Sequence, residues 1–123
     1  MPGVVIRAGV AAHPYVASFV HLGYAANMAL DLNGINSQEI PYRVMAPGCV
    51  GGIMIKFSQP LTNPLLVRVY KNGVSFFSRT VNAGETDFEE AFSTTDFPIV
   101  STDELFCRIE GDAWNPSVQL KIM

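Results

Sequence analysis

The sequence predicts an all-β fold, an antiparallel β-sandwich, and three observations support this prediction. From residue 40 onward, short runs rich in β-branched and aromatic residues alternate with turn-forming segments, which is typical of sandwiches and barrels. The stretch "VRVYKNGVSFFSRTV" (67–81) places two such runs on either side of Asn72-Gly73, a strong signal for a two-residue hairpin turn. A chain of 123 residues with 49% apolar content is also large enough to bury one core.

The expected strands follow from these runs, and the segments between them carry turn residues. We expect strands at residues 41–45, 52–58, 65–70, 74–81, 105–110 and 118–122. Pro60 and Pro64 mark one of the loops, because proline cannot donate to a central ladder. The segments "APG", "NAGET" and "GDAWNP" are turn and loop chemistry of the same kind.

The first third of the chain is less regular. Residues 4–10 ("VVIRAGV") have the composition of a strand, and so do residues 15–22. Residues 24–32 are rich in alanine and can form a short helix that ends at Asn33-Gly34. We therefore expect residues 1–35 to form an N-terminal arm with the first strand or strands, and residues 36–123 to form the sandwich, in a single domain overall.

The hairpin at Asn72-Gly73 predicts a register. A two-residue turn pairs Lys71 with Val74, Tyr70 with Ser75, Val69 with Phe76 and Arg68 with Phe77. Alternation then directs one set of side chains to the core, Val67, Val69, Val74 and Phe76. The other set faces outward: Arg68, Tyr70, Ser75 and Phe77. Two aromatics and an arginine favour a protein interface there, although isolated surface aromatics or a bulge that inverts the register are alternatives.

The charge is unevenly distributed. Only 15% of the residues are charged and the net charge is −3. Residues 85–112 contain nine acids and one base, whereas residues 8–30 carry no formal charge when His13 and His21 are neutral. An uncharged segment of that length does not suit a free surface, so we expect part of it to complete the sandwich and the rest to lie across a neighbouring chain. The acidic block then meets a basic patch on a partner.

Composition also excludes several partners. There is no basic stripe, which argues against direct binding of nucleic acid. The longest apolar run, residues 45–55, is too short to span a membrane and is interrupted by glycines. For Cys49 and Cys107 the favoured interpretation is a pair of buried reduced thiols, with a single bridge left open.

No catalytic motif is present in the sequence. The two histidines lack a clustered set of metal ligands, and Asp87, Glu89 and Glu90 do not have calcium-loop spacing, so a solvated acidic face is favoured. Trp114 can stack on a sugar ring, but a lone tryptophan beside a strand is more often a core or rim residue. We therefore expect a protein that is not an enzyme and that needs no cofactor and no metal.

Three stretches carry a resemblance to a known group of proteins. They are "IPYRVMAPGCVGGIMIKFSQPL" (40–61), "VRVYKNGVSFFSRTVNAGET" (67–86) and "FPIVSTDELFCRIEGD" (97–112). Together they resemble small jelly-roll domains of bacteriophage virion proteins, which include fibre heads and capsid decoration (cement) proteins. The resemblance implies a jelly-roll-like antiparallel β-sandwich.

The same resemblance implies a structural role in a virion. The expected function is that of a capsid decoration protein, which stabilises the head by bridging capsid subunits. Its partners would be the major capsid protein or other virion subunits, with a homo-oligomer, preferably a trimer, on the capsid exterior after synthesis in the host cytoplasm. The alternative is a receptor- or carbohydrate-binding head domain of a phage fibre. The expected interface residues are Tyr15, Phe19, Leu22, Tyr24, Arg68, Tyr70 and Phe77.

Overall fold

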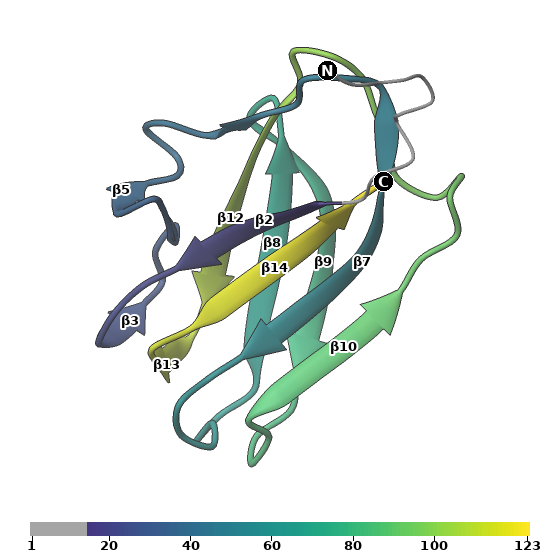
Figure 1. The fold of residues 1–123 in the computed structure, drawn as a ribbon. Coiled ribbons are helices and arrows are strands. Elements are labelled where there is room, and N and C mark those ends of the chain that lie inside the picture. The colour runs from purple at the N-terminus through teal and green to yellow at the C-terminus, as the bar shows by residue number, and fades with distance from the viewer. Residues whose placement is uncertain (1–14) are drawn as a thin grey trace.

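The computed structural model describes residues 15–123, which fold into two antiparallel β-sheets packed face to face (Figure 1). The larger sheet contains β2 (Tyr15–Val20), β4 (Asp31–Leu32), β5 (Ile35–Asn36), β7 (Gly48–Lys56), β10 (Asp87–Ala91), β11 (Pro98–Ile99) and β14 (Ser117–Ile122). The smaller sheet contains β6 (Tyr42–Arg43), β8 (Leu65–Lys71), β9 (Val74–Val81) and β12 (Glu104–Glu110). A separate ribbon pairs β3 (Tyr24–Ala26) with β13 (Asp112–Trp114).

The fold is a jelly-roll-like β-sandwich, as the sequence predicted. Each of the six expected strands overlaps an observed strand. The strand expected at residues 4–10 and His13 lie outside the described residues. Within residues 15–123 no helix is long and apolar enough to cross a membrane.

The beginning of the described chain belongs to the larger sheet. Strand β2 pairs along its whole length with β14, which in turn pairs with β7, so β14 lies at the centre of the sheet (Figure 1). Alternation along β2 places Ala17 and Phe19 in the core, where Phe19 has no exposed surface. The expectation that Phe19 contributes to an interface is therefore wrong, because its side chain fills the interior of its own sandwich.

The hairpin of the smaller sheet contains a β-bulge that the sequence prediction left open. Next to the turn the expected pairs form, Lys71 with Val74 and Tyr70 with Ser75, but Val69 then pairs with Phe77. Phe76 is the extra residue, and every residue beyond it changes face.

The bulge corrects the predicted faces of the hairpin. Phe77 is 8% exposed and packs against Phe92 and Phe97, with ring centroids 5.3 and 4.3 Å away, so its assignment to an outer interface is wrong. Val74, expected in the core, is 69% exposed for a different reason: it pairs with Lys71 as predicted but adjoins the turn at the end of the hairpin. Val69 is fully buried, as expected.

The alanine-rich segment 24–32 is not a helix. It contains β3, an isolated bridge from Ala29 to Arg108, and β4. Asn27 has a positive φ of 48°, which interrupts a helix, and Leu30 donates its N–H to the carbonyl oxygen of Cys107. The backbone groups of the segment are therefore bonded to β12 and β13 and not within a helix.

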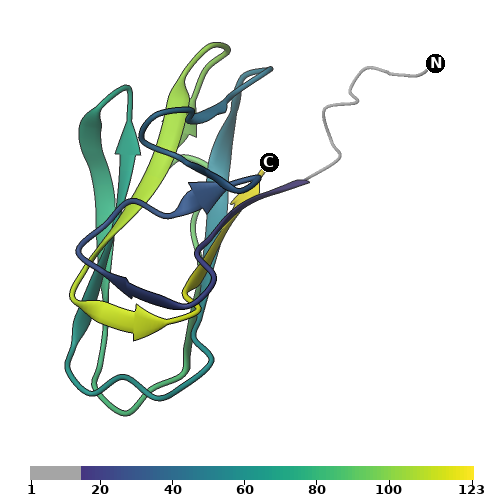
Figure 2. The same cartoon turned by 90° about the vertical axis from the view of Figure 1, so that its left-hand side faces the viewer.

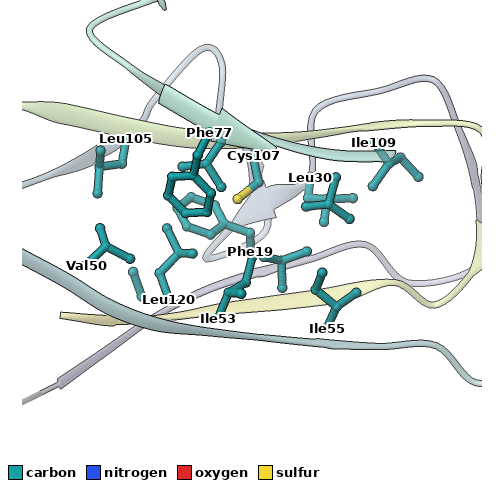
Figure 3. Packing of buried hydrophobic residues seen from close by; sticks show 14 of the residues in the cluster. Phe19, Leu30, Val50, Ile53, Ile55, Phe77, Leu105, Cys107, Ile109 and Leu120 are labelled. Carbon is teal, nitrogen blue, oxygen red and sulfur yellow. The ribbon is translucent and has the colours of Figure 1, made fainter. Parts of the chain in front are cut away.

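The core lies between the inner faces of the two sheets (Figures 2 and 3). Its largest fully buried side chains include Phe19, Leu30, Ile55, Leu105 and Leu120. Cys49 and Cys107 are both buried and free, which confirms the favoured interpretation of two thiols. Burial raises the pKa of the Cys107 thiol above its ordinary value, so this thiol is neutral and unreactive.

One long side of the sandwich is closed by an ion pair between the sheets. Arg79 of β9 donates to Glu90 of β10 at 2.6 Å, and its guanidinium lies over the rings of Phe77 and Phe92. The Arg79 guanidinium lowers the pKa of Glu90. Strands β9 and β10 are edge strands of their sheets. Inward-pointing charges such as those of Arg79 and Glu90 discourage other strands from pairing with these edges.

The bulge makes a direct prediction about stability. We expect Phe77→Ala to lower the free energy of unfolding by about 3 to 5 kcal/mol, because it leaves a cavity among packed rings. Val74→Ala is the matched control in the same hairpin. It should change the free energy of unfolding by less than about 0.5 kcal/mol. Urea unfolding of both variants provides the test. A large loss for Val74→Ala together with a small loss for Phe77→Ala would contradict the register described above.

Candidate functional site

An exposed apolar surface lies at one end of the sandwich, on the ribbon and on the turn that leads into it. Leu22, Tyr24 and Trp114, which we call the ribbon surface, are 82%, 51% and 45% exposed. In the ribbon Trp114 pairs with Tyr24, and Ala113 pairs with Ala25. Alternation turns the two small alanines into the core and the two rings outward, where their centroids lie 5.4 Å apart and their planes are tilted by 58°.

Hydrogen bonds hold the ribbon surface in place. Asn115 has a positive φ of 49°, and its side-chain oxygen accepts a 2.6 Å bond from the Gly23 N–H. Its own N–H donates to the Gly23 carbonyl at 2.8 Å, and its side-chain amide donates to the Ser58 hydroxyl at 2.9 Å. Three segments far apart in sequence are thereby tied together, so the exposed rings lose little freedom when a partner covers them.

The hydroxyl of Tyr24 is fixed as well. It donates to a carboxylate oxygen of Asp112 at 2.9 Å, within the same ribbon. This hydrogen bond to the Asp112 carboxylate raises the pKa of Tyr24, so the phenol keeps its proton at neutral pH. The ribbon surface therefore presents two oriented rings with a polar rim, an arrangement suited to binding and without a reactive group.

A groove lies on the outer face of the smaller sheet. This sheet groove has a volume of about 550 Å³ and is lined by Gln38, Pro41, Tyr70, Asn72, Gly73, Glu104, Phe106 and Arg108. Its volume falls in the range of small-molecule sites, about 300 to 1,000 Å³. Tyr70 and Phe106 face each other across β8 and β12 with centroids 4.5 Å apart and planes within 5° of parallel.

The wall of the groove is fixed by the hairpin turn. Asn72 donates its backbone N–H to the Glu104 carbonyl at 2.8 Å, and its side-chain oxygen accepts the Glu104 N–H at 2.9 Å. The Asn72 amide also donates to Asp103 at 2.9 Å. Asp103 accepts the Val100 N–H at 2.8 Å, and these bonds lower the pKa of its carboxyl group.

Two arginines flank the groove. Arg68 and Arg108 pair directly across β8 and β12, so their charges would repel if they pointed at one another. Arg68 instead donates to Glu110 at 3.1 Å and to Ser75 at 3.3 Å. Arg108 donates to the Asn27 carbonyl at 2.8 Å. The two guanidinium groups are thus held by different partners, and the charge of Arg108 is not paired with a carboxylate among the described residues.

The structure divides the predicted interface residues among several places. Leu22 and Tyr24 are both exposed on the ribbon surface, and Tyr70 lines the groove, whereas Arg68, two residues before it on β8, is not a lining residue. Tyr15 is 43% exposed at the start of β2 and contacts Tyr42, with ring centroids 6.3 Å apart. Whether any of these residues touches a partner stays a prediction.

Sequence reasoning missed Phe106 and Arg108, and it favoured a core or rim position for Trp114 over sugar stacking. Alternation gives a signal for Phe106, since it lies between the buried Leu105 and Cys107 and so faces outward. No local signal identifies the role of Trp114, because its partner strand is about ninety residues away in the chain.

The acidic block does not form a metal centre in the part of the chain that the structure describes. Asp87 and Glu89 lie exposed on the edge strand β10, and Glu90 pairs with Arg79. Among residues 15–123 no group of three histidine, cysteine or acidic side chains is placed to hold a metal ion. His21 contacts Asp31 at 3.1 Å, which joins the end of β2 to β4. The expectation that the protein needs no metal stays a prediction.

Comparisons with known proteins identify the fold. A scan against protein-family models found no match, and a search of curated proteins found none. The chain is similar to the CBM36-1 domain of a multidomain xylanase from the hindgut metagenome of Trinervitermes trinervoides, with a TM-score of 0.54 and 8% identity over 88% of this chain and 96% of that chain. At this identity the likeness shows a shared fold alone.

Two further structures resemble the chain more distantly. A family 35 carbohydrate-binding module from Clostridium thermocellum has a TM-score of 0.48 and 14% identity over 91% of this chain and 98% of that chain. Infectious bursal disease virus, Gx strain, has a TM-score of 0.37 and 12% identity over 89% of this chain and 32% of that chain. Both TM-scores are below 0.5, and nothing is inferred from them.

The contacts of Asp103 predict a dependence of stability on pH. Its folded pKa is lowered, so its bonds stabilise the fold above the unfolded value of about 3.9, and this stabilisation is lost as the pH falls through the folded pKa. We expect Asp103→Ala to unfold at less urea than the wild type at neutral pH, with a difference that shrinks in acid. Glu39→Ala removes an exposed carboxylate and serves as control. If the urea midpoints of the wild type and Asp103→Ala differed by the same amount at every pH, the stabilising role of the ionised Asp103 carboxylate would be contradicted.

Proposed function

We propose that the chain is a non-enzymatic structural protein of a phage virion, which decorates the capsid by docking its ribbon surface on capsid subunits. The observation that carries this proposal is the rigid, exposed group of Leu22, Tyr24 and Trp114 at one end of the sandwich. Tryptophan and tyrosine are the residues most enriched at the energetic centres of protein interfaces. Leu22 is 82% exposed and adds apolar area that a docked partner would bury.

The energetics suit a docking contact. Burying one fully exposed large apolar side chain contributes roughly 1.5 to 3 kcal/mol. Leu22 is 82% exposed and can contribute most of such an amount, whereas Tyr24 and Trp114, at 51% and 45% exposure, can contribute about half each. Hydrogen bonds from Asn115 already hold two of these anchors in place, which reduces the entropy lost on binding. A contact of this kind needs shape and apolar area, and no catalytic group.

The charge distribution complements this contact. The sequence has only 15% charged residues, and nine acids fall within residues 85–112. Asp87 and Glu89 stand exposed on the edge strand β10. Acids on an edge would meet a basic patch on a partner and set its orientation, while the ribbon surface supplies the affinity.

The finer features of the proposal follow the resemblance to phage virion proteins. We place the chain on the capsid exterior after synthesis in the host cytoplasm, in contact with the major capsid protein or other virion subunits. A homo-oligomer, preferably a trimer, would repeat the ribbon surface and allow several capsid subunits to be bridged at once. No direct contact with nucleic acid or membrane is included in the proposal.

A second candidate is a carbohydrate-binding head domain of a phage fibre. The tilted pair of Tyr24 and Trp114 favours it, because exposed rings can stack on the apolar face of a sugar. The chain also shares its fold with a domain named as a carbohydrate-binding module, at a TM-score of 0.54. Under this alternative the same rings would contact a glycan in place of a capsid subunit.

The proposal is tested with particles assembled without this chain. We expect Trp114→Ala to weaken co-sedimentation with the particle by about 30-fold or more, the effect of a hot spot worth roughly 2 kcal/mol. Met45→Ala is the matched control: Met45 is 77% exposed and its carbonyl accepts a bond from Ser101, near the start of β12.

The melting temperatures of both variants are measured alongside, since the exposed side chains contribute little to the fold. Full particle binding by Trp114→Ala would contradict docking through the ribbon surface. Competition of wild-type binding by free oligosaccharides would favour the fibre-head alternative.

A further inference from the structure

We propose that the sheet groove is a second binding site, specific for a neutral oligosaccharide. This inference goes beyond the docking role, because the groove lies on the outer face of the smaller sheet, whereas the ribbon surface lies beyond the end of β12. The groove runs along β12 from Glu104 to Arg108, whose guanidinium bonds to the Asn27 carbonyl next to β3, so its Arg108 end is near the ribbon. The Glu104 end lies roughly 13 Å further along the strand. A chain docked by its ribbon surface can therefore leave the Glu104 end of the groove free.

The groove combines hydrogen-bonding groups of both kinds. Among residues 15–123 the side chains of Gln38 and Glu104 have no hydrogen-bond partner, and both are exposed at the rim. Arg108 uses one terminal nitrogen for the Asn27 carbonyl and keeps its other donors available. The carboxylate accepts, the guanidinium donates and the amide does both, which is the set that sugar hydroxyls require.

The charges of the groove favour a neutral ligand. Glu104 and Arg108 lie four residues apart on the same face of β12, roughly 13 Å from one another, and their charges cancel over the groove as a whole. Arg68 is neutralised by Glu110. A phosphate or other strong anion needs several unopposed cations, so it would meet Glu104 unfavourably.

Purely apolar ligands and extended peptides fit the groove less well. A hydrocarbon would remove water from Gln38 and Glu104 without replacing their hydrogen bonds, which is costly. A peptide that adds as a strand needs an open sheet edge, but β12 lies between β6 and β8, and β8 also pairs with β9. A sugar has an apolar C–H face for the ring of Tyr70, which Phe106 supports from the other side, and hydroxyls for the polar rim.

The site is preorganised. Phe106 is 8% exposed and is held parallel to Tyr70, and Asn72 fixes the start of β12 by two backbone-directed hydrogen bonds. The groups that would contact the ligand therefore need little rearrangement.

The test uses the purified 123-residue chain on an array of immobilised neutral oligosaccharides, with sialylated and sulfated oligosaccharides as the anionic arm. Calorimetry with the best neutral binder then compares four variants. Gln38→Ala and Glu104→Ala alter the groove, whereas Gln119→Ala alters the outer side of the larger sheet and Trp114→Ala alters the ribbon surface. We expect each groove variant to bind about tenfold more weakly, as expected for one lost hydrogen bond to a positioned group, and the two controls to bind like the wild type.

The outcomes separate this inference from the docking role. The groove variants should melt like the wild type and should still bind particles, because neither side chain holds the fold or the ribbon. The groove proposal is overturned if no neutral oligosaccharide binds, if only anionic ones bind, or if only Trp114→Ala abolishes binding. The last result would place the sugar on the ribbon surface and favour the fibre-head alternative.

Discussion

The β-bulge at Phe76 is the constraint on which both faces of the smaller sheet depend. Because Val69 pairs with Phe77 while Tyr70 pairs with Ser75, one extra residue lets the hairpin send a ring inward on β9 and keep a ring outward on β8. The inward ring, Phe77, joins Phe92 and Phe97 and underlies the Arg79–Glu90 pair that closes the side of the sandwich. The outward ring, Tyr70, is free to stack on Phe106 and to line the groove. Without the bulge, Phe76 would point inward opposite Val69, and Phe77 would lie on the outer face of the sheet.

Strand β12 connects the two proposed surfaces. It carries the groove at its start, crosses the core through Leu105, Cys107 and Ile109, and leads through Gly111 into the ribbon. Gly111 has a φ of 118°, which side-chain-bearing residues rarely adopt, so the chain can turn sharply from the sheet into β13. The ribbon is thereby anchored to the most deeply buried strand of the smaller sheet. A rigid link of this kind suits a protein that attaches by one end and presents a second surface elsewhere.

Much of the fold was predictable because its signals are local. Strands 65–70 and 74–81 follow from alternation, and the turn pairs next to Asn72-Gly73 are those that the turn type dictates. The bulge was not predictable, since its cost is offset by packing of Phe77 against rings about fifteen to twenty residues further along the chain. The supposed helix at 24–32 fails for the same kind of reason: β3 finds its partner in β13, at the far end of the sequence. Of the candidate site, Leu22 and Tyr24 were identified from an uncharged segment, but Trp114 joins them only through that long-range pairing.

Docking through the ribbon surface can be tested most directly by hydroxyl-radical footprinting of the chain, free and bound to its particle. Mass spectrometry resolves the oxidation of Trp114, the only tryptophan of the sequence, from that of Met45 and Tyr70. The account predicts that binding protects Trp114 and Tyr24, while Met45 and the groove residue Tyr70 are oxidised as in the free chain. Equal oxidation of Trp114 in free and bound chains, with Met45 or Tyr70 protected in the bound one, would contradict it.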